Sequence, residues 1–330
     1  FASAATGARF ETSVRVYHDA IAFEQRFPQG LNGTSANDID KLITSFPSFA
    51  MPSEGAPRRG FLQYSKDMMG SHYRTGEWNA ESSGVGSGVA GTGPLCVFSE
   101  DFANSVVLSA FSNFMAESHY YDIRTTGPPA SAAATLSLGL MGGIESLPAG
   151  YSVEFLMVHS VRGPNENMVR WGDKLLGRYG KSRTGAWERD LTLQTLGYST
   201  DNGGYYYYNT LGKGMTYEET MIAVSDYAKA AGIPYKWWLA DSWWYYKGVG
   251  NGVKTWVARP DIFPRGLEYV WKRTGWPVQG HNRYWASDNT YAKQNGGAYD
   301  FLVDAESDFA LPNSQRFWDD LLRNSSLWGL

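Results

Sequence analysis

A single cysteine, Cys96, stands among the 330 residues of the chain. One thiol excludes an intrachain disulfide and a cysteine-rich zinc site. No apolar run approaches the ~20 residues that a membrane-spanning helix needs. Neither sign of charge is in large excess, because 29 Lys and Arg stand against 33 Asp and Glu for a net charge of −4. Since nucleic-acid binding needs clustered positive charge, the sequence predicts neither a nucleic-acid partner nor a membrane span.

The sequence also lacks the short motifs of several enzyme classes. It contains no HExxH zinc motif, no P-loop and no GxSxG nucleophile turn. We therefore predict no metal and no organic cofactor. What the chain does contain is 43% hydrophobic residues, enough for large cores, and a length that favours two domains.

The N-terminal half has the pattern of β-structure. Apolar and polar residues alternate around positions 14–16, 136–140 and 153–157, as in strands that turn one face to a core. This pattern places Val14 and Val16 on a buried face. No convincing amphipathic helix interrupts these short strands, so we predict an antiparallel β-sandwich over residues 1–188.

Over residues 189–330 the pattern changes to alternating strands and helices. A short apolar run at 193–199 leads into the turn-like segment at 201–204. Thr216 and Glu219 form a capping box at the start of a predicted helix, which ends at Gly232. The other predicted elements are a strand at 235–240, a helix at 264–274, a strand at 277–282 and a helix after Pro312.

Successive β-α units after a sandwich are typical of the first part of a (β/α)8 TIM barrel. A complete barrel of eight units usually needs ~250 residues, and residues 189–330 have room for about three units. We expect the remaining barrel on the same polypeptide beyond Leu330, or on a second chain. The alternative is that these residues form a complete, small, open α/β domain of unrelated function.

The candidate site residues follow the predicted strand ends, which line the active site of a barrel. Asp241 ends the apolar run 237–240, and His281 and Asp201 stand in the same relation to two other strands. Aromatic faces beside carboxylates suit a polyhydroxylated ring, although aromatic residues also serve as core packing, and Asp201 is also an ordinary turn residue. The predicted sugar-binding residues are Asp241, Trp243, Trp244, His281 and Trp285, with Asp201 and Tyr205 as weaker members.

Three segments resemble the opening of the barrel in the α-galactosidase and raffinose-synthase type of glycoside hydrolase. They are LGYSTDNG at 196–203, GIPYKWWLADSWW at 232–244 and FPRGL at 263–267. That family has an N-terminal β-sandwich followed by a (β/α)8 barrel. The resemblance implies that Asp241 is the first acid of a pair that holds sugar hydroxyls. Ser242 departs from the family, which usually has a second Asp there, and this puts galactose specificity in doubt.

The resemblance further implies a retaining glycosidase or transglycosidase that acts on α-linked sugars through two carboxylates. In the family, the nucleophile ends strand four and the acid/base ends strand six. Both positions are expected beyond Leu330, so no catalytic residue is assigned. The rival interpretation is a non-catalytic carbohydrate-binding or structural protein of a cell surface or extracellular assembly, which kept the fold and lost the chemistry.

Two N-glycosylation triplets begin at Asn32 and Asn324. They favour a secreted protein or one in the endomembrane lumen. Because the first residue, Phe1, is not Met, we also expect further sequence upstream, either a signal peptide or another segment.

Overall fold

The computed structural model describes residues 8–52, 57–65, 72–80, 84–88, 91, 93–123, 134–183, 185, 187–201 and 204–330. Its contacts divide the chain into two compact units, Phe1–Ser182 and Arg183–Leu330. The boundary predicted between residues 188 and 189 lies close to this division. Each unit is described by itself.

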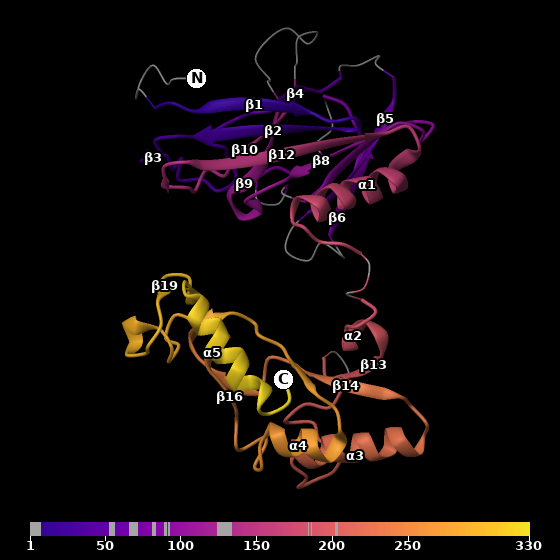
Figure 1. Cartoon of the computed structure of the whole chain (residues 1–330), viewed down its shortest axis with the longest axis vertical. Helices are drawn as coiled ribbons and strands as arrows, with labels where there is room; N and C mark the ends of the chain where they lie inside the picture. Colours follow the sequence, from indigo (N-terminus) through magenta and orange to yellow (C-terminus); the bar gives the residue numbers. More distant parts are fainter. Residues whose placement is uncertain are drawn as a thin grey trace. The chain divides into compact units, whose positions relative to one another are not determined.

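The larger sheet of the N-terminal unit is antiparallel, with seven strands among the described residues. The strands follow the order β1-β2-β12-β8-β7-β5-β6 (Figure 1). The longest pairing joins β12 to β2, from Tyr151 opposite Phe27 to Val158 opposite Ala20. The strands span Glu11–Val16 (β1), Ala20–Phe27 (β2), Arg59–Tyr64 (β5), Tyr73–Glu77 (β6), Leu95–Ser99 (β7), Ser105–Ala110 (β8) and Tyr151–Ser160 (β12).

A smaller antiparallel sheet packs against one face of the larger one. It has the order β4-β10-β9, with β4 at Ser48–Ala50, β9 at Glu117–Ile123 and β10 at Ala134–Leu140. Two further short strands, β3 (Leu31–Asn32) and β11 (Ser146–Leu147), pair with each other in an antiparallel arrangement. A 3-10 turn at Phe114–Ala116 precedes β9. Leu136 and Leu138 of the smaller sheet share one buried cluster with Phe61 and Phe155 of the larger sheet. Two antiparallel sheets around a common core form the predicted β-sandwich.

Two features of this unit differ from the sequence prediction. Val14 and Val16 are 52% and 76% exposed, because β1 is an edge strand, so the prediction that they face the core is wrong. The helix α1 (Gly163–Arg178) was not predicted, and it covers the outer face of the large sheet (Figure 1). Trp171 and Leu175 of α1 pack there, and few other apolar residues mark the helix in the sequence.

The C-terminal unit contains a parallel sheet of β13 (Leu196–Ser199), β14 (Tyr235–Ala240) and β17 (Val278–Gly280), with β14 in the centre. Helix α3 (Tyr217–Ala230) joins β13 to β14, and α4 (Leu267–Thr274) precedes β17. The predicted strands and helices occur in the predicted order along the chain, but strands that were not predicted stand between them, and residues 193–194 of the apolar run belong to a helix, α2 (Leu191–Gln194). Within the described residues the sheet ends at β13 on one side and at β17 on the other, and it does not close into a barrel.

The boundaries of α3 follow from local chemistry. Thr216 accepts a hydrogen bond from the Glu219 N–H, and the Glu219 carboxylate accepts one from the Thr216 N–H, which completes the predicted capping box. The helix ends before Gly232, whose φ of +69° is the left-handed conformation that favours glycine. These local signals made α3 predictable.

A second sheet in this unit was not predicted. It has the order β15-β16-β18-β20-β19, and its two neighbouring 3-10 turns lie at Val249–Asn251 and Lys293–Asn295. Its strands and the remaining helices are Tyr245–Lys247 (β15), Val253–Ala258 (β16), Trp285–Ala286 (β18), Phe301–Asp304 (β19), Phe309–Pro312 (β20), Leu191–Gln194 (α2) and Gln315–Ser326 (α5). No helix of the described chain has the length and apolar character needed to cross a membrane.

Glu117 and His119 lie inside the sandwich and are 2% and 0% exposed. Their Oε2 and Nε2 atoms are 3.5 Å apart, and both imidazole nitrogens lack a hydrogen-bond partner among the described residues. Burial raises the pKa of Glu117 to about 8 and lowers the pKa of His119 to about 4. The pair is therefore an uncharged carboxylic acid beside a neutral imidazole at pH 7.

This pair predicts a fall in stability from pH 6.5 to pH 8. In that range the folded chain keeps a proton on Glu117 that the unfolded carboxylate, with its ordinary pKa of 4.5, has released. The free energy of unfolding should therefore fall by up to about 1.4 kcal/mol per pH unit. Between pH 4.5 and 6.5, unfolded His119 takes up a proton and offsets this effect. Native-state hydrogen exchange of β9 and β10 measures the change.

The Glu117→Gln variant should remove this slope, and Glu145→Gln, at an exposed carboxylate, should retain it. An equal slope in wild type and Glu117→Gln would contradict the assignment.

In the C-terminal unit, the carboxylate of Glu218 joins α3 to the segment before α4. It is fully buried and accepts the Arg265 N–H at 2.8 Å and the Arg265 Nε–H at 2.5 Å. We expect Glu218→Ala to destabilise this unit by about 1–3 kcal/mol, because the Arg265 N–H loses a charged acceptor. Tryptophan fluorescence in a denaturant titration measures it.

The control is Glu268→Ala, which removes a half-exposed carboxylate paired with Lys272. An exposed pair four residues apart contributes about 0.5 kcal/mol or less. Equal losses for the two variants would show that burial of Glu218 has no special effect.

Candidate functional site

Three polar residues follow the carboxyl ends of the parallel strands. Asp201 comes two residues after β13, and Asp241 and His281 directly follow β14 and β17. Strand alternation places Asp241 and His281 on the sheet face opposite to Ala240, which packs in the buried core of the unit. Parallel strands bring these ends to one edge, as the sequence predicts.

Thr200 links the ends of β13 and β14. This side chain is fully buried. Its hydroxyl donates to the Leu239 carbonyl at 2.7 Å and accepts the Asp241 N–H at 3.1 Å. The backbone of Asp241 is therefore held from one side by Thr200. On the other side, the His281 N–H donates to the Ala240 carbonyl at 2.9 Å.

Asp241 and His281 contact each other directly. The Oδ1 of Asp241 lies 2.5 Å from Nδ1 of His281. A carboxylate only accepts hydrogen bonds, so Nδ1 carries the proton and Nε2 is the second functional atom of the ring. The Asp241 side chain is 17% exposed and that of His281 is 46% exposed. The pair thus presents carboxylate and imidazole atoms to solvent at one strand edge.

Two basic residues, Lys247 and Arg283, lie in the neighbourhood of Asp241, and Arg283 stands within the predicted strand-end segment. Lys247 is on β15, and its pKa is lowered by burial and by Arg283, while Asp241 opposes the shift. The Arg283 N–H donates to the buried Tyr245 hydroxyl at 3.3 Å. The sequence did not indicate a role for Lys247, because Lys247 lies on β15, in the sheet that the sequence periodicity did not reveal.

The weaker predicted members take different positions. Asp201 is exposed, and its N–H donates to the Ser199 hydroxyl at 3.2 Å, so it occupies the turn after β13; Asn202 and Gly203 lie outside the described residues. Tyr205 is half-buried and lines an apolar groove with Tyr198 and Val224. Tyr205 thus faces α3.

The three predicted tryptophans are buried core residues. Trp243, Trp244 and Trp285 are 5%, 0% and 3% exposed. Trp243 packs edge-on against Tyr217 with ring centroids 4.5 Å apart, and Trp244 packs against Trp256 at 4.5 Å. Trp285 belongs to β18. This burial corrects the expectation that these rings line a sugar subsite, because a stacking ring must expose a face.

Two other aromatic rings near the strand ends are exposed. Tyr207 and Tyr208 are 44% and 73% exposed. The Tyr207 ring lies 6.0 Å from the ring of Trp243, and the backbone N–H of Trp243 donates to the Asp241 carbonyl at 2.6 Å. The run of four tyrosines at 205–208, shortly after β13, was the available signal in the sequence.

The site has no metal-binding composition. Among the described residues no group of three or more His, Cys, Asp or Glu side chains is placed to hold a metal ion. The Asp241–His281 pair fits hydrogen bonding to hydroxyl groups, for which a carboxylate supplies acceptors.

The link through Thr200 predicts a local effect of Thr200→Val. Valine keeps the size of the side chain and removes both hydrogen bonds, so the Asp241 N–H loses its acceptor. We expect local opening at Asp241 to become easier by about 1–3 kcal/mol, or about 5- to 150-fold in its amide exchange rate. Hydrogen exchange measures this, and Thr200→Ser should restore protection. An unchanged rate in Thr200→Val would exclude this role.

No family model matches the sequence, and no curated protein matches it. Solved structures share the fold. An α-galactosidase from Lactobacillus brevis matches with a TM-score of 0.54 and 10% identity over 98% of this chain and 44% of its own. An α-N-acetylgalactosaminidase from Bifidobacterium bifidum, in complex with Gal-NHAc-DNJ, matches with a TM-score of 0.52 and 11% identity over 99% of this chain and 55% of its own. The same enzyme in complex with GalNAc matches with a TM-score of 0.50 and 9% identity.

The chain therefore spans about half the length of these glycosidases. The likeness shows a glycoside-hydrolase-like fold.

Proposed function

We propose that this chain supplies the sugar-binding strand ends of a glycoside hydrolase or transglycosidase that acts on α-linked sugars. The observation that carries the proposal is the contact of 2.5 Å between Asp241 and His281, at the carboxyl ends of neighbouring parallel strands. Ligands of α/β proteins bind at this edge of the sheet. The fold shared with an α-galactosidase and an α-N-acetylgalactosaminidase supports the same assignment.

In this proposal Asp241 accepts hydrogen bonds from sugar hydroxyls, and His281 both orients Asp241 and contacts a neighbouring hydroxyl. Asp201 is a peripheral contact. Trp243 and Trp244 act through packing behind the site, and the exposed Tyr207 is the aromatic ring available for the C–H face of a sugar.

The proposed reaction is the retaining one, in which one carboxylate attacks the anomeric carbon and another serves as acid and then base. We assign neither role to a residue of this chain. The proposal places both carboxylates on further β/α units, from the same polypeptide or from a second chain.

A non-catalytic carbohydrate-binding protein is the second candidate. This candidate needs only the hydroxyl-binding pair of Asp241 and His281 and no catalytic carboxylate. Residues Asn32 and Asn324 are both exposed, so each is open to glycosylation. We propose a secreted or endomembrane location on this basis.

Sugar binding is the first test. Calorimetric titration with methyl α-D-galactopyranoside and with N-acetylgalactosamine should show binding that weakens about tenfold or more in Asp241→Asn, because a charged acceptor is lost. His281→Gln should weaken it less. Asp300→Asn is the matched control, since Asp300 is an exposed carboxylate paired with Lys293. Absence of binding to either sugar, or an equal effect of the control, would contradict the proposal.

Catalysis is tested separately with the longest natural polypeptide that contains this sequence. Turnover of a nitrophenyl α-galactoside, with retention at the anomeric carbon by NMR, would support the retaining glycosidase. Binding that depends on Asp241 without turnover of any α-glycoside would favour the non-catalytic protein.

A further inference from the structure

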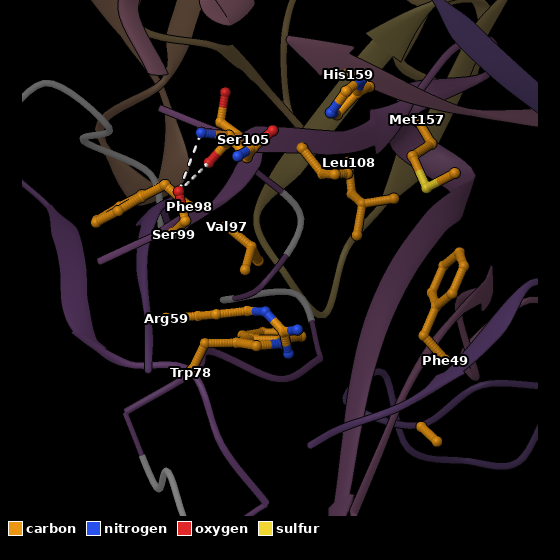
Figure 2. Close-up of a pocket in the computed structure, with 13 residues that line it drawn as sticks. Phe49, Arg59, Trp78, Val97, Phe98, Ser99, Ser105, Leu108, Met157 and His159 are labelled. Atoms are coloured by element: carbon orange, nitrogen blue, oxygen red, sulfur yellow. Dashed lines mark hydrogen bonds between the residues drawn. The ribbon is translucent and has the colours of Figure 1, made fainter. Parts of the chain in front are cut away.

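A pocket of about 300 Å³ opens at one end of the β-sandwich, within the N-terminal unit (Figure 2). Val97, Val106 and Leu108 from the large sheet line it together with Met157. Phe49 of the small sheet and Trp78 after β6 line it as well. The volume is at the lower end of the range for small-molecule sites. This pocket belongs to the sandwich and contains none of the residues of the strand-end site.

Strand register explains the apolar lining. Val97 lies opposite Val106, and Val106 lies opposite His159 on β12. In the next rank, Leu108 lies opposite Met157. These side chains point to the same face of the sheet, the one that elsewhere packs in the sandwich core.

Two basic side chains also line the pocket. Arg59 comes from β5 and His159 from β12, with β7 and β8 between them in the sheet. Three interstrand steps of about 4.8 Å place their backbones about 14 Å apart. The apolar side chains therefore occupy the interval between two groups that can carry positive charge.

Neither basic group is neutralised by the protein. No Asp or Glu is among the described residues that line the pocket. Within the described part of the chain, the side chains of Arg59 and His159 make no ion pair or hydrogen bond. By contrast, the adjacent Arg58 binds Glu77 at 2.8 Å. The Arg59 backbone is fixed, because its carbonyl accepts the Trp78 N–H at 2.7 Å.

We propose that this pocket binds a small amphipathic carboxylate, an aromatic or medium-chain aliphatic acid. Its apolar body lies between the sheets against Phe49, Val106 and Met157, and its carboxylate binds the guanidinium of Arg59. A guanidinium matches a carboxylate through two parallel hydrogen bonds. A sugar is a poor occupant, since its hydroxyls would be buried against apolar side chains without partners.

The test uses 2-naphthoate and its uncharged analogue 2-naphthamide as probes of the whole chain. In NMR titrations with labelled methyl groups, 2-naphthoate should shift the signals of Val97, Val106 and Met157. In Arg59→Met its affinity should fall at least tenfold and approach that of the amide. The control Arg58→Met removes a neighbouring arginine that does not line the pocket, and it should bind 2-naphthoate like wild type.

A second variant, Val106→Phe, fills the pocket and should abolish binding of both probes; its fold is checked by hydrogen exchange of β8 and β12. The shifts of the methyl signals in the wild-type protein test the proposal even if Val106→Phe does not fold. Equal affinity for the acid and the amide, shifts confined to other residues, or no binding below millimolar concentration would each overturn the proposal. So would self-association through this face, which would assign it to a second copy of the chain.

Discussion

The parallel pairing of β14 with both neighbours is the constraint on which the C-terminal unit depends. Because β14 is central, the backbone at its end is held twice: the Leu239 carbonyl accepts the Thr200 hydroxyl, and the Ala240 carbonyl accepts the His281 N–H. Those two hydrogen bonds bring the residues after β14 and β17 to one edge, and Asp241 meets His281 there. The same strand buries Trp238 against Tyr217 of α3. One strand thus positions the candidate site on one side and anchors the helical layer on the other.

The aromatic residues after β14 show how tightly the site and the core are connected. The turn at Asp241, where its carbonyl accepts the Trp243 N–H, directs the next two tryptophans into the core. Their rings pack well, but both indole N–H groups lack a partner among the described residues, and such a buried donor is unfavourable. The packing of large apolar rings outweighs this loss. Among the described residues near this strand end, the exposed rings are instead those of Tyr207 and Tyr208.

The parts of this structure that local rules determine were predictable from sequence. The capping box of Thr216 and the glycine at 232 defined α3, and the apolar run before Asp241 defined β14. The proximity of residues 241 and 281 was predicted from their positions at strand ends alone.

The other features of the structure depend on strand pairings between segments that are distant in sequence. Two-residue β18 has no local signature, α1 carries few apolar residues, and the exposure of Val16 depends on β1 being an edge. The tryptophans were misplaced because composition does not distinguish a stacking ring from a buried one.

The residue after Asp241 in the chain is Ser242, and its surroundings differ from those of Asp241. The Ser242 side chain lies near the Tyr245 phenol, which accepts the Arg283 N–H at 3.3 Å. The side chain that contacts Asp241 is instead the imidazole of His281, which follows the adjacent strand β17. A pair of carboxylates offers only acceptors, whereas a carboxylate beside a histidine also offers a group that can donate when protonated. Adjacent sugar hydroxyls both donate and accept. The Asp241–His281 pair therefore combines a carboxylate with an imidazole, and its hydrogen-bonding groups differ from those of an Asp–Asp pair.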